Sequence, residues 1–161
     1  MPSTMVQSLS RATTATFEEL ALLFPEHQLT DEQTAAPLGL AVSVDFRGPF
    51  NGRLVLEVST SILPLAASNM LGEHEGKQPQ LQRDALGELA NVICGNVLPA
   101  IAGQEAVFHL SAPKVHEDAT AVSREHDAAQ ARTEFGVEDG RARVALYVFG
   151  DAEAMLAVTG A

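Results

Sequence analysis

The stretch of residues 81–102 constrains the fold most strongly, because it predicts one long amphipathic helix that ends at Gly103. On a wheel that turns by about 100° per residue, its large apolar side chains gather on one side. Proline lacks a backbone N–H, so Pro99 is expected to kink the last turns or to end the helix early. The apolar side consists of Leu86, Leu89, Ile93, Val97 and Ala100. We expect this side to pack into the protein.

The opposite side of this helix carries a narrow polar stripe. With Asp84 at zero, Glu88 lies near about +40°, Asn91 near about −20° and Gly95 near about +20° on the wheel. Glu88 and Asn91 are three residues apart, so their side chains are surface neighbours. An amide can hold a water for in-line attack on a phosphoryl group, and a carboxylate can pair with a partner's lysine. Gly95 would let another backbone come close.

A Glu and an Asn on the exposed side of a helix are also ordinary, and this spacing occurs by chance. Gly87 and Gly95 each lower the stability of the helix by about 0.5–1 kcal/mol relative to alanine. Their presence therefore favours a functional role for the stripe.

The residues before the long helix predict two further helices and one hairpin. Residues 3–24 predict a helix with an apolar stripe that ends before Pro25, followed by a polar loop at 27–37. Residues 38–46 and 53–58 predict a hairpin around the turn at 48–52. A short helix follows to Leu71, capped by Thr60 or Ser61, with Pro64 in its first turn and Gly72 as its C-cap.

The C-terminal part predicts a second set of strands. These are residues 106–110, 130–137 and 141–149, the last two joined by a turn at 138–140, with a polar, acidic loop at 116–127 and a weakly patterned tail at 152–161. Helices and antiparallel hairpins are segregated, so we expect an α+β fold with helices on one face of an antiparallel sheet. We expect residues 1–161 to form one domain.

The net charge of −11 argues against nucleic acid and anionic membranes as partners, since both select basic patches. A basic protein partner fits this charge, and so does mere solubility. A single cysteine allows no internal disulfide and suits the reducing cytoplasm. The N-terminus does not resemble a signal peptide, and we expect no apolar stretch that approaches the roughly 20 residues of a membrane helix.

Two other sets of residues could suggest a site. The acidic loop holds His116, Glu117, Asp118, His126 and Asp127, but their spacing fits no known metal-ligand pattern and a solvated loop explains them. Cys94 lies at the edge of the apolar side of the long helix, which favours a packing role over a nucleophilic one. We therefore expect no metal and no intrinsic cofactor.

The long helix resembles the signature helix of the CheC/CheX/FliY phosphatases. Their pattern is Asp or Ser, three residues, Glu, two residues, Asn, and a Pro some 22 residues further on; Asp84, Glu88, Asn91 and Pro113 match it. Residues 46–56 and 66–72 resemble the hairpin and the helix that precede the signature helix in this family. The likeness covers residues 38–149.

The resemblance implies dephosphorylation of CheY-like response regulators in chemotaxis or another two-component pathway. It implies that Asn91 positions the attacking water and that Glu88 engages the receiver's active-site lysine, while the receiver supplies the Mg²⁺. We expect a local structural or docking role for Asp84.

The number of copies of the Glu-x-x-Asn motif indicates which subfamily the chain resembles. CheC-type members carry two copies, and the first helix does not hold a second one, because Ala21 and Leu22 follow Glu18 and Glu19 where Asn is required. A FliY-like protein would need an added flagellar-switch domain. The chain therefore resembles CheX, whose members are typically homodimers.

Two alternatives remain. The chain could keep the CheX fold and bind a receiver or another signalling partner without turnover, since fold does not imply function. It could instead be an unrelated α+β domain with an accidental motif, in which case Glu88 and Asn91 would be buried or occluded.

Overall fold

The fold is taken from a computed structural model, which describes residues 4–72, 76–117 and 129–149 of the chain. Its helical elements are α1 (Thr4–Leu20), α2 (Asp31–Ala35), the 3₁₀ turn η1 (Thr60–Ile62), α3 (Leu63–Leu71) and α4 (Pro79–Ala102). Its strands are β1 (Leu40–Arg47), β2 (Asn51–Val58), β3 (His109–Leu110), β4 (Lys114–His116), β5 (Ala131–Val137) and β6 (Gly140–Phe149).

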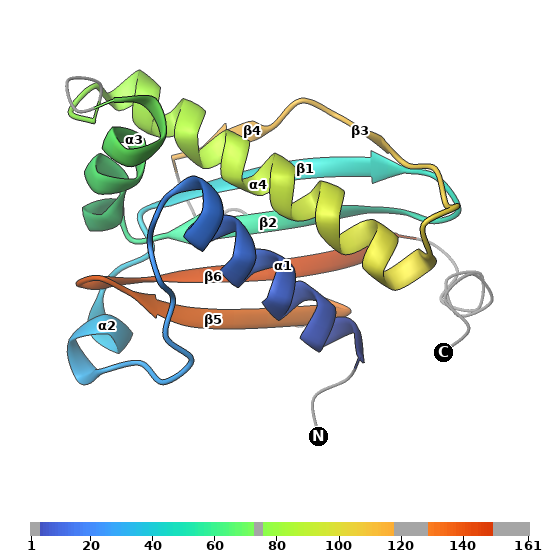
Figure 1. The fold of residues 1–161 in the computed structure, drawn as a ribbon, viewed down its shortest axis with the longest axis horizontal. Coiled ribbons are helices and arrows are strands. Elements are labelled where there is room, and N and C mark those ends of the chain that lie inside the picture. The colour runs from blue at the N-terminus through green and yellow to red at the C-terminus, as the bar shows by residue number, and fades with distance from the viewer. Residues whose placement is uncertain (1–3, 73–75, 118–128, 150–161) are drawn as a thin grey trace.

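The strands within the described residues form a six-stranded sheet in the order β3-β1-β2-β6-β5, with β4 also paired to β1. Every pairing is antiparallel. Helices α1, α3 and α4 cover one face of this sheet (Figure 1). The predicted α+β architecture, with helices on one face of an antiparallel sheet, is confirmed.

Helix α4 lies at the centre of the helical layer, in contact with α1, α3, β1 and β2 (Figure 1). Leu86, Leu89, Ile93 and Val97 are fully buried, as predicted. Ala100 is exposed, so that part of the prediction is wrong. Leu98 is buried near the C-terminal end instead, and α1 packs beside the helix as well as the sheet below it.

The long helix runs on past Pro99, so the expectation of an early end is wrong. The Pro99 carbonyl accepts the Gly103 N–H at 2.8 Å, and Gly103 has the positive φ of 97° that glycine tolerates. The helix therefore ends at Gly103, as predicted from the sequence.

Helix α1 is shorter than predicted. It ends at Leu20, because the N–H groups of Ala21 and Leu23 both donate to the Phe17 carbonyl and Leu22 takes a left-handed conformation with φ 54°. Phe24 is 67% exposed and does not belong to the buried stripe.

Part of the expected polar loop at 27–37 is helix α2. Its N-terminus is a capping box, in which the Thr30 hydroxyl accepts the Gln33 N–H at 3.1 Å and the Gln33 amide oxygen accepts the Thr30 N–H at 2.9 Å. The segment was expected to be a loop because its residues are polar. The Thr-x-x-Gln spacing, however, is a signal for the start of a helix.

The hairpins and α3 follow the prediction closely, with Gly72 as the C-cap of α3. The predicted side-chain cap is wrong: neither Thr60 nor Ser61 caps a helix, because the 3₁₀ turn η1 leads into α3 instead.

The strand expected at 106–110 shrinks to β3, and β4 takes in His116, which was expected in a loop. His116 is fixed by a 2.9 Å hydrogen bond between its Nε2 and the Ser43 hydroxyl of β1. Residues 118–127 of the expected loop and the tail at 152–161 lie outside the described residues.

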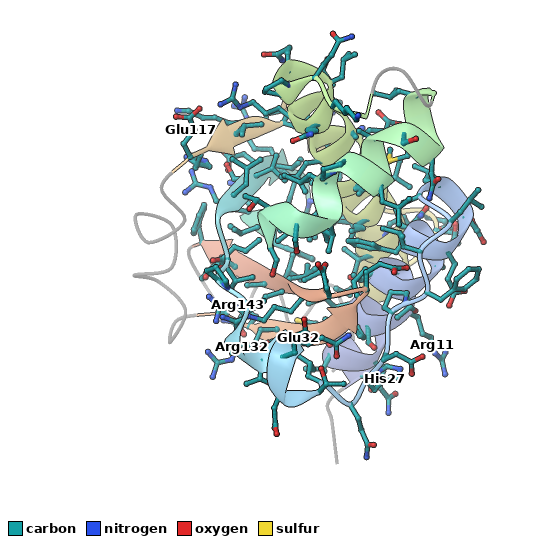
Figure 2. The ribbon with its side chains drawn as sticks, turned by 90° about the vertical axis from the view of Figure 1, so that its left-hand side faces the viewer. Arg11, His27, Glu32, Glu117, Arg132 and Arg143 are labelled. Carbon is teal, nitrogen blue, oxygen red and sulfur yellow. The ribbon has the colours of Figure 1, made fainter. Side chains whose placement is uncertain are left out.

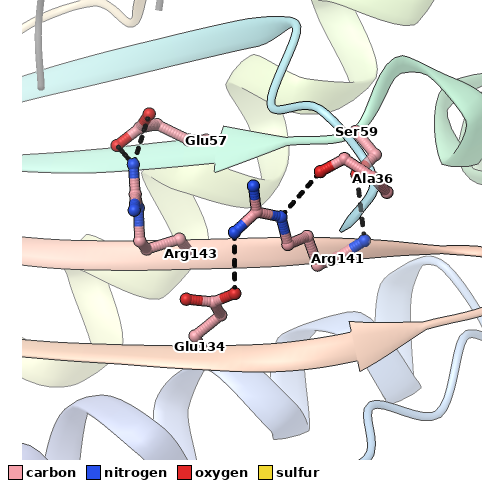
Figure 3. Close-up of polar contacts among 6 residues, drawn as sticks. All are labelled: Ala36, Glu57, Ser59, Glu134, Arg141 and Arg143. Carbon is pink, nitrogen blue, oxygen red and sulfur yellow. Dashed lines mark hydrogen bonds and ion pairs between the residues drawn. The ribbon is translucent and has the colours of Figure 1, made fainter. Parts of the chain in front are cut away.

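Charged side chains pair across strands on the sheet face opposite the helices. Arg143 of β6 donates to the buried carboxylate of Glu57 on β2 at 3.2 Å (Figure 3). Arg141 donates to Glu134 of β5 at 3.1 Å and to the Ala36 carbonyl at 2.8 Å. These pairs compensate the desolvation of charges on β2 and β6.

Helix α4 is long and apolar enough to cross a membrane by length and composition alone, so the expectation that no stretch approaches this length is wrong. Half of its most apolar window is buried inside the protein. The apolar composition is explained by its place between the sheet and two neighbouring helices, and it is weak evidence for a membrane span.

Candidate functional site

The polar stripe of α4 faces away from the sheet, since the opposite side of the helix is in the core. Asp84, Glu88 and Gly95 are exposed and Asn91 is half-buried. The structure thus brings all four predicted site residues onto one open side of a single helix. An accidental motif was expected to be buried or occluded, and this stripe is neither.

The carboxylate and the amide at the middle of the stripe are available for a ligand. Within the described part of the chain, the side chains of Glu88 and Asn91 have no hydrogen-bond or ion-pair partner. Asp84 differs, because the Gln80 amide nitrogen donates to its Oδ1 at 2.9 Å. Glu88 and Asn91 therefore need no bond to another described residue to be broken before they bind a partner.

The first half of the stripe borders a hollow of about 500 Å³. One wall comes from α4 and includes Asp84 and Glu88, and the other comes from the segment around β4 and includes Pro113 and Val115. Pro113, the fourth residue of the motif, thus lies beside the first two although it is more than 20 residues away in sequence.

Gly87 allows this segment to approach the helix. A Cβ built on Gly87 would lie 3.3 Å from the Cβ of Pro113, which is tighter than ordinary contact. The helix-breaking cost of this glycine is thereby explained, since any side chain would push Pro113 away from the wall of the hollow.

Arg83 is a residue of the site that the sequence did not reveal. It lines the hollow together with Asp84, and its guanidinium forms an ion pair with Glu117. Glu117 lies just after β4, close to α4 (Figure 2). The two residues are far apart in the chain and follow no pattern, so only the fold brings them together.

The two glycines of α4 should respond in opposite ways to substitution. We expect Gly87→Leu to lower the free energy of unfolding by about 1–3 kcal/mol, because the new side chain overpacks against Pro113. Gly95→Ala should raise it by about 0.5–1 kcal/mol, since a Cβ at Gly95 meets nothing within 4 Å. Urea unfolding of both variants measures this; equal shifts would contradict the assigned contact.

Cys94 is fully buried, as its place on the helix predicted. Burial raises the pKa of the Cys94 thiol to about 12. At pH 8 only about one native thiol in ten thousand is then a thiolate, against about one in ten for a thiol with the ordinary pKa of 9.0. We expect native protein to react with a disulfide reagent at least about 100-fold more slowly than urea-unfolded protein. Similar rates would show that Cys94 is accessible.

The structure describes only part of the loop that was weighed as a metal site. His116 and Glu117 are described, while Asp118, His126 and Asp127 lie outside the described residues. No group of three or more His, Cys, Asp and Glu side chains that could hold a metal ion occurs among residues 4–72, 76–117 and 129–149.

Comparison with solved structures shows that this fold is that of chemotaxis proteins. The chain is similar to the chemotaxis protein CheX of Desulfovibrio desulfuricans, with 17% identity, a TM-score of 0.68 and coverage of 90% of this chain and 99% of that chain. It is similar to CheX in the CheX–CheY–BeF₃–Mg²⁺ complex of Borrelia burgdorferi, with 15% identity, a TM-score of 0.63 and coverage of 90% and 97%. Thermotoga maritima FliY matches at 15% identity and a TM-score of 0.56, with coverage of 94% and 87%.

A family model places the chain more closely. The model described as chemotaxis phosphatase CheX matches residues 40–136, which run from the first residue of β1 to the last but one of β5 and contain the whole of α4. This chain belongs to the CheX family. No curated protein matches it.

Proposed function

We propose that this chain accelerates the loss of phosphate from the phosphorylated aspartate of a CheY-like receiver domain. The observation that carries the proposal is the pair of Glu88 and Asn91, side by side on the open side of α4 and without a partner among the described residues. Membership of a phosphatase family supports the same reaction class.

Asn91 accelerates the attack of water on the phosphoryl group, a step that is slow in the receiver alone. Its amide accepts a hydrogen bond from a water and donates one to a phosphoryl oxygen, which holds the water in line with the bond between phosphorus and the aspartate oxygen. The water oxygen forms a bond to phosphorus as the bond to aspartate breaks. The aspartate leaves as a carboxylate, one proton of the water passes to a phosphoryl oxygen, and the product is inorganic phosphate.

Glu88 fixes the position of the receiver. Its carboxylate pairs with the lysine of the receiver's active site, a charge-assisted bond that also orients the neighbouring Asn91. Asp84 and its Gln80 contact form the outer end of the same docking surface. The Mg²⁺ is expected on the receiver, where it neutralises phosphoryl charge during the reaction.

The partner class is supported by a similar structure, the CheX–CheY–BeF₃–Mg²⁺ complex of Borrelia burgdorferi. For the present chain the receiver remains a proposal, as do a homodimeric state, a cytoplasmic location and a single domain over residues 1–161.

The test is the decay of a phosphorylated receiver from the same organism, followed with and without this chain. Acceleration by catalytic amounts of the chain supports the proposal. Binding of the activated receiver without acceleration would move the chain to the class of non-catalytic receiver-binding modules. Absence of both would reject the receiver as partner.

A further inference from the structure

A second hollow of about 380 Å³ borders α4 one turn beyond Asn91, and all its described lining residues are apolar. The helix contributes Gly95, Leu98 and Pro99, and the segment before β3 contributes Val107 and Phe108. The first hollow, beside Glu88, has charged walls instead. The stripe therefore has a polar end and an apolar end.

Gly95 belongs both to the polar stripe and to the apolar hollow. A Cβ built at Gly95 would meet no described atom within 4 Å outside the neighbouring backbone of α4, whereas a Cβ built at Gly87 would lie 3.3 Å from the Cβ of Pro113. Internal packing thus gives no reason for a residue that weakens the helix. The missing side chain instead keeps the hollow open toward any molecule docked on the stripe.

Pro99 leaves one backbone carbonyl group, that of Gly95, without its usual hydrogen bond. In an α-helix the carbonyl of Gly95 would accept the N–H of residue 99, and proline has none to donate. The Gly95 carbonyl therefore lacks the regular donor of an α-helix. On the opposite rim, Val107 is 68% exposed.

We propose that the hollow receives one apolar side chain of the receiver, from a loop that passes over Gly95 and donates a backbone N–H to its carbonyl. This inference rests on the proposed function. Gly95 and Asn91 are four residues apart, about 6 Å along the axis, so that loop lies next to the phosphorylated aspartate. Glu88 at one end and the hollow at the other then define a single orientation of the receiver on α4.

Filling the hollow tests the proposal. We expect Gly95→Leu to weaken binding of a beryllofluoride-activated receiver by about tenfold or more, because the leucine occupies the pocket. The matched control is Ala100→Leu, which adds a leucine at an exposed position of α4 that points about 140° away from Gly95. It should bind normally.

Val107→Glu is a second, independent variant, because it places a charge on the exposed rim without entering the core. It should weaken receiver binding as well. Unchanged affinity in both Gly95→Leu and Val107→Glu would overturn the proposal. So would loss of self-association with receiver binding intact, measured by sedimentation, because the hollow would then hold a second copy of the chain.

These outcomes are distinguishable from failure of the proposed function. If Asn91→Ala loses activity while Gly95→Leu binds the receiver tightly, only the role of the hollow is wrong. If the unchanged protein neither binds nor dephosphorylates the receiver, the proposed function itself is wrong.

Discussion

Asn91→Ala should remove the acceleration of receiver dephosphorylation, with a loss of about 10²-fold or a fall to the receiver's own decay rate. The amide is the only part of this site proposed to hold the attacking water, and alanine neither accepts from water nor donates to a phosphoryl oxygen. The measurement is single-turnover decay of the phosphorylated receiver at saturating concentrations of the variant.

The same variant should keep its fold and its affinity for the receiver. Asn91 is half-buried and without a side-chain partner among the described residues, and alanine has the higher helix propensity. We expect the free energy of unfolding to change by less than about 1 kcal/mol. Loss of affinity together with activity would show that Asn91 binds the receiver and does not act by holding the attacking water.

Asn96→Ala is the matched control for this experiment. Asn96 is an exposed asparagine of the same helix, about 140° around the axis from Asn91. It makes the same chemical change outside the stripe and should retain full activity. Equal loss in the two variants would assign the effect to the helix as a whole, and full activity in Asn91→Ala would reject the role of Asn91.

The periodicity of the sequence was sufficient to predict the stripe and most of the fold. An amphipathic helix displays its polar residues wherever its apolar side packs, so Glu88 and Asn91 could be placed without knowledge of the tertiary structure. Turn residues and alternating strands likewise predicted both long hairpins.

Features that depend on tertiary contact were missed or wrong. The ion pair of Arg83 with Glu117 joins positions that no local pattern relates. The wheel also treats the buried side as a straight line, whereas near the C-terminal end of α4 Leu98 is buried and Ala100 is exposed. Gly87 could be predicted only in part. Its destabilisation of the helix indicated that glycine is needed at this position, and the position of Pro113 in the fold showed that the reason is close packing.

Glu88→Lys should weaken binding of the activated receiver by about 10²-fold, since a favourable pair with the receiver's lysine becomes a repulsion between like charges. Glu88 is exposed, so the fold should tolerate the substitution. The dissociation constant is best measured at two salt concentrations. The penalty should shrink at the higher one, because salt screens exposed charges.

Glu18→Lys separates a local pair from the effect of overall charge. It produces the same change in net charge from an exposed position near the C-terminus of α1, where a cation is compatible with the helix dipole. Its binding should change by less than about threefold, because it lies outside the proposed docking surface. If both variants weaken binding equally, Glu88 acts only through the net charge of −11, and its pairing with the receiver's lysine is wrong. If Glu88→Lys alone weakens binding, the carboxylate contacts a cation of the receiver.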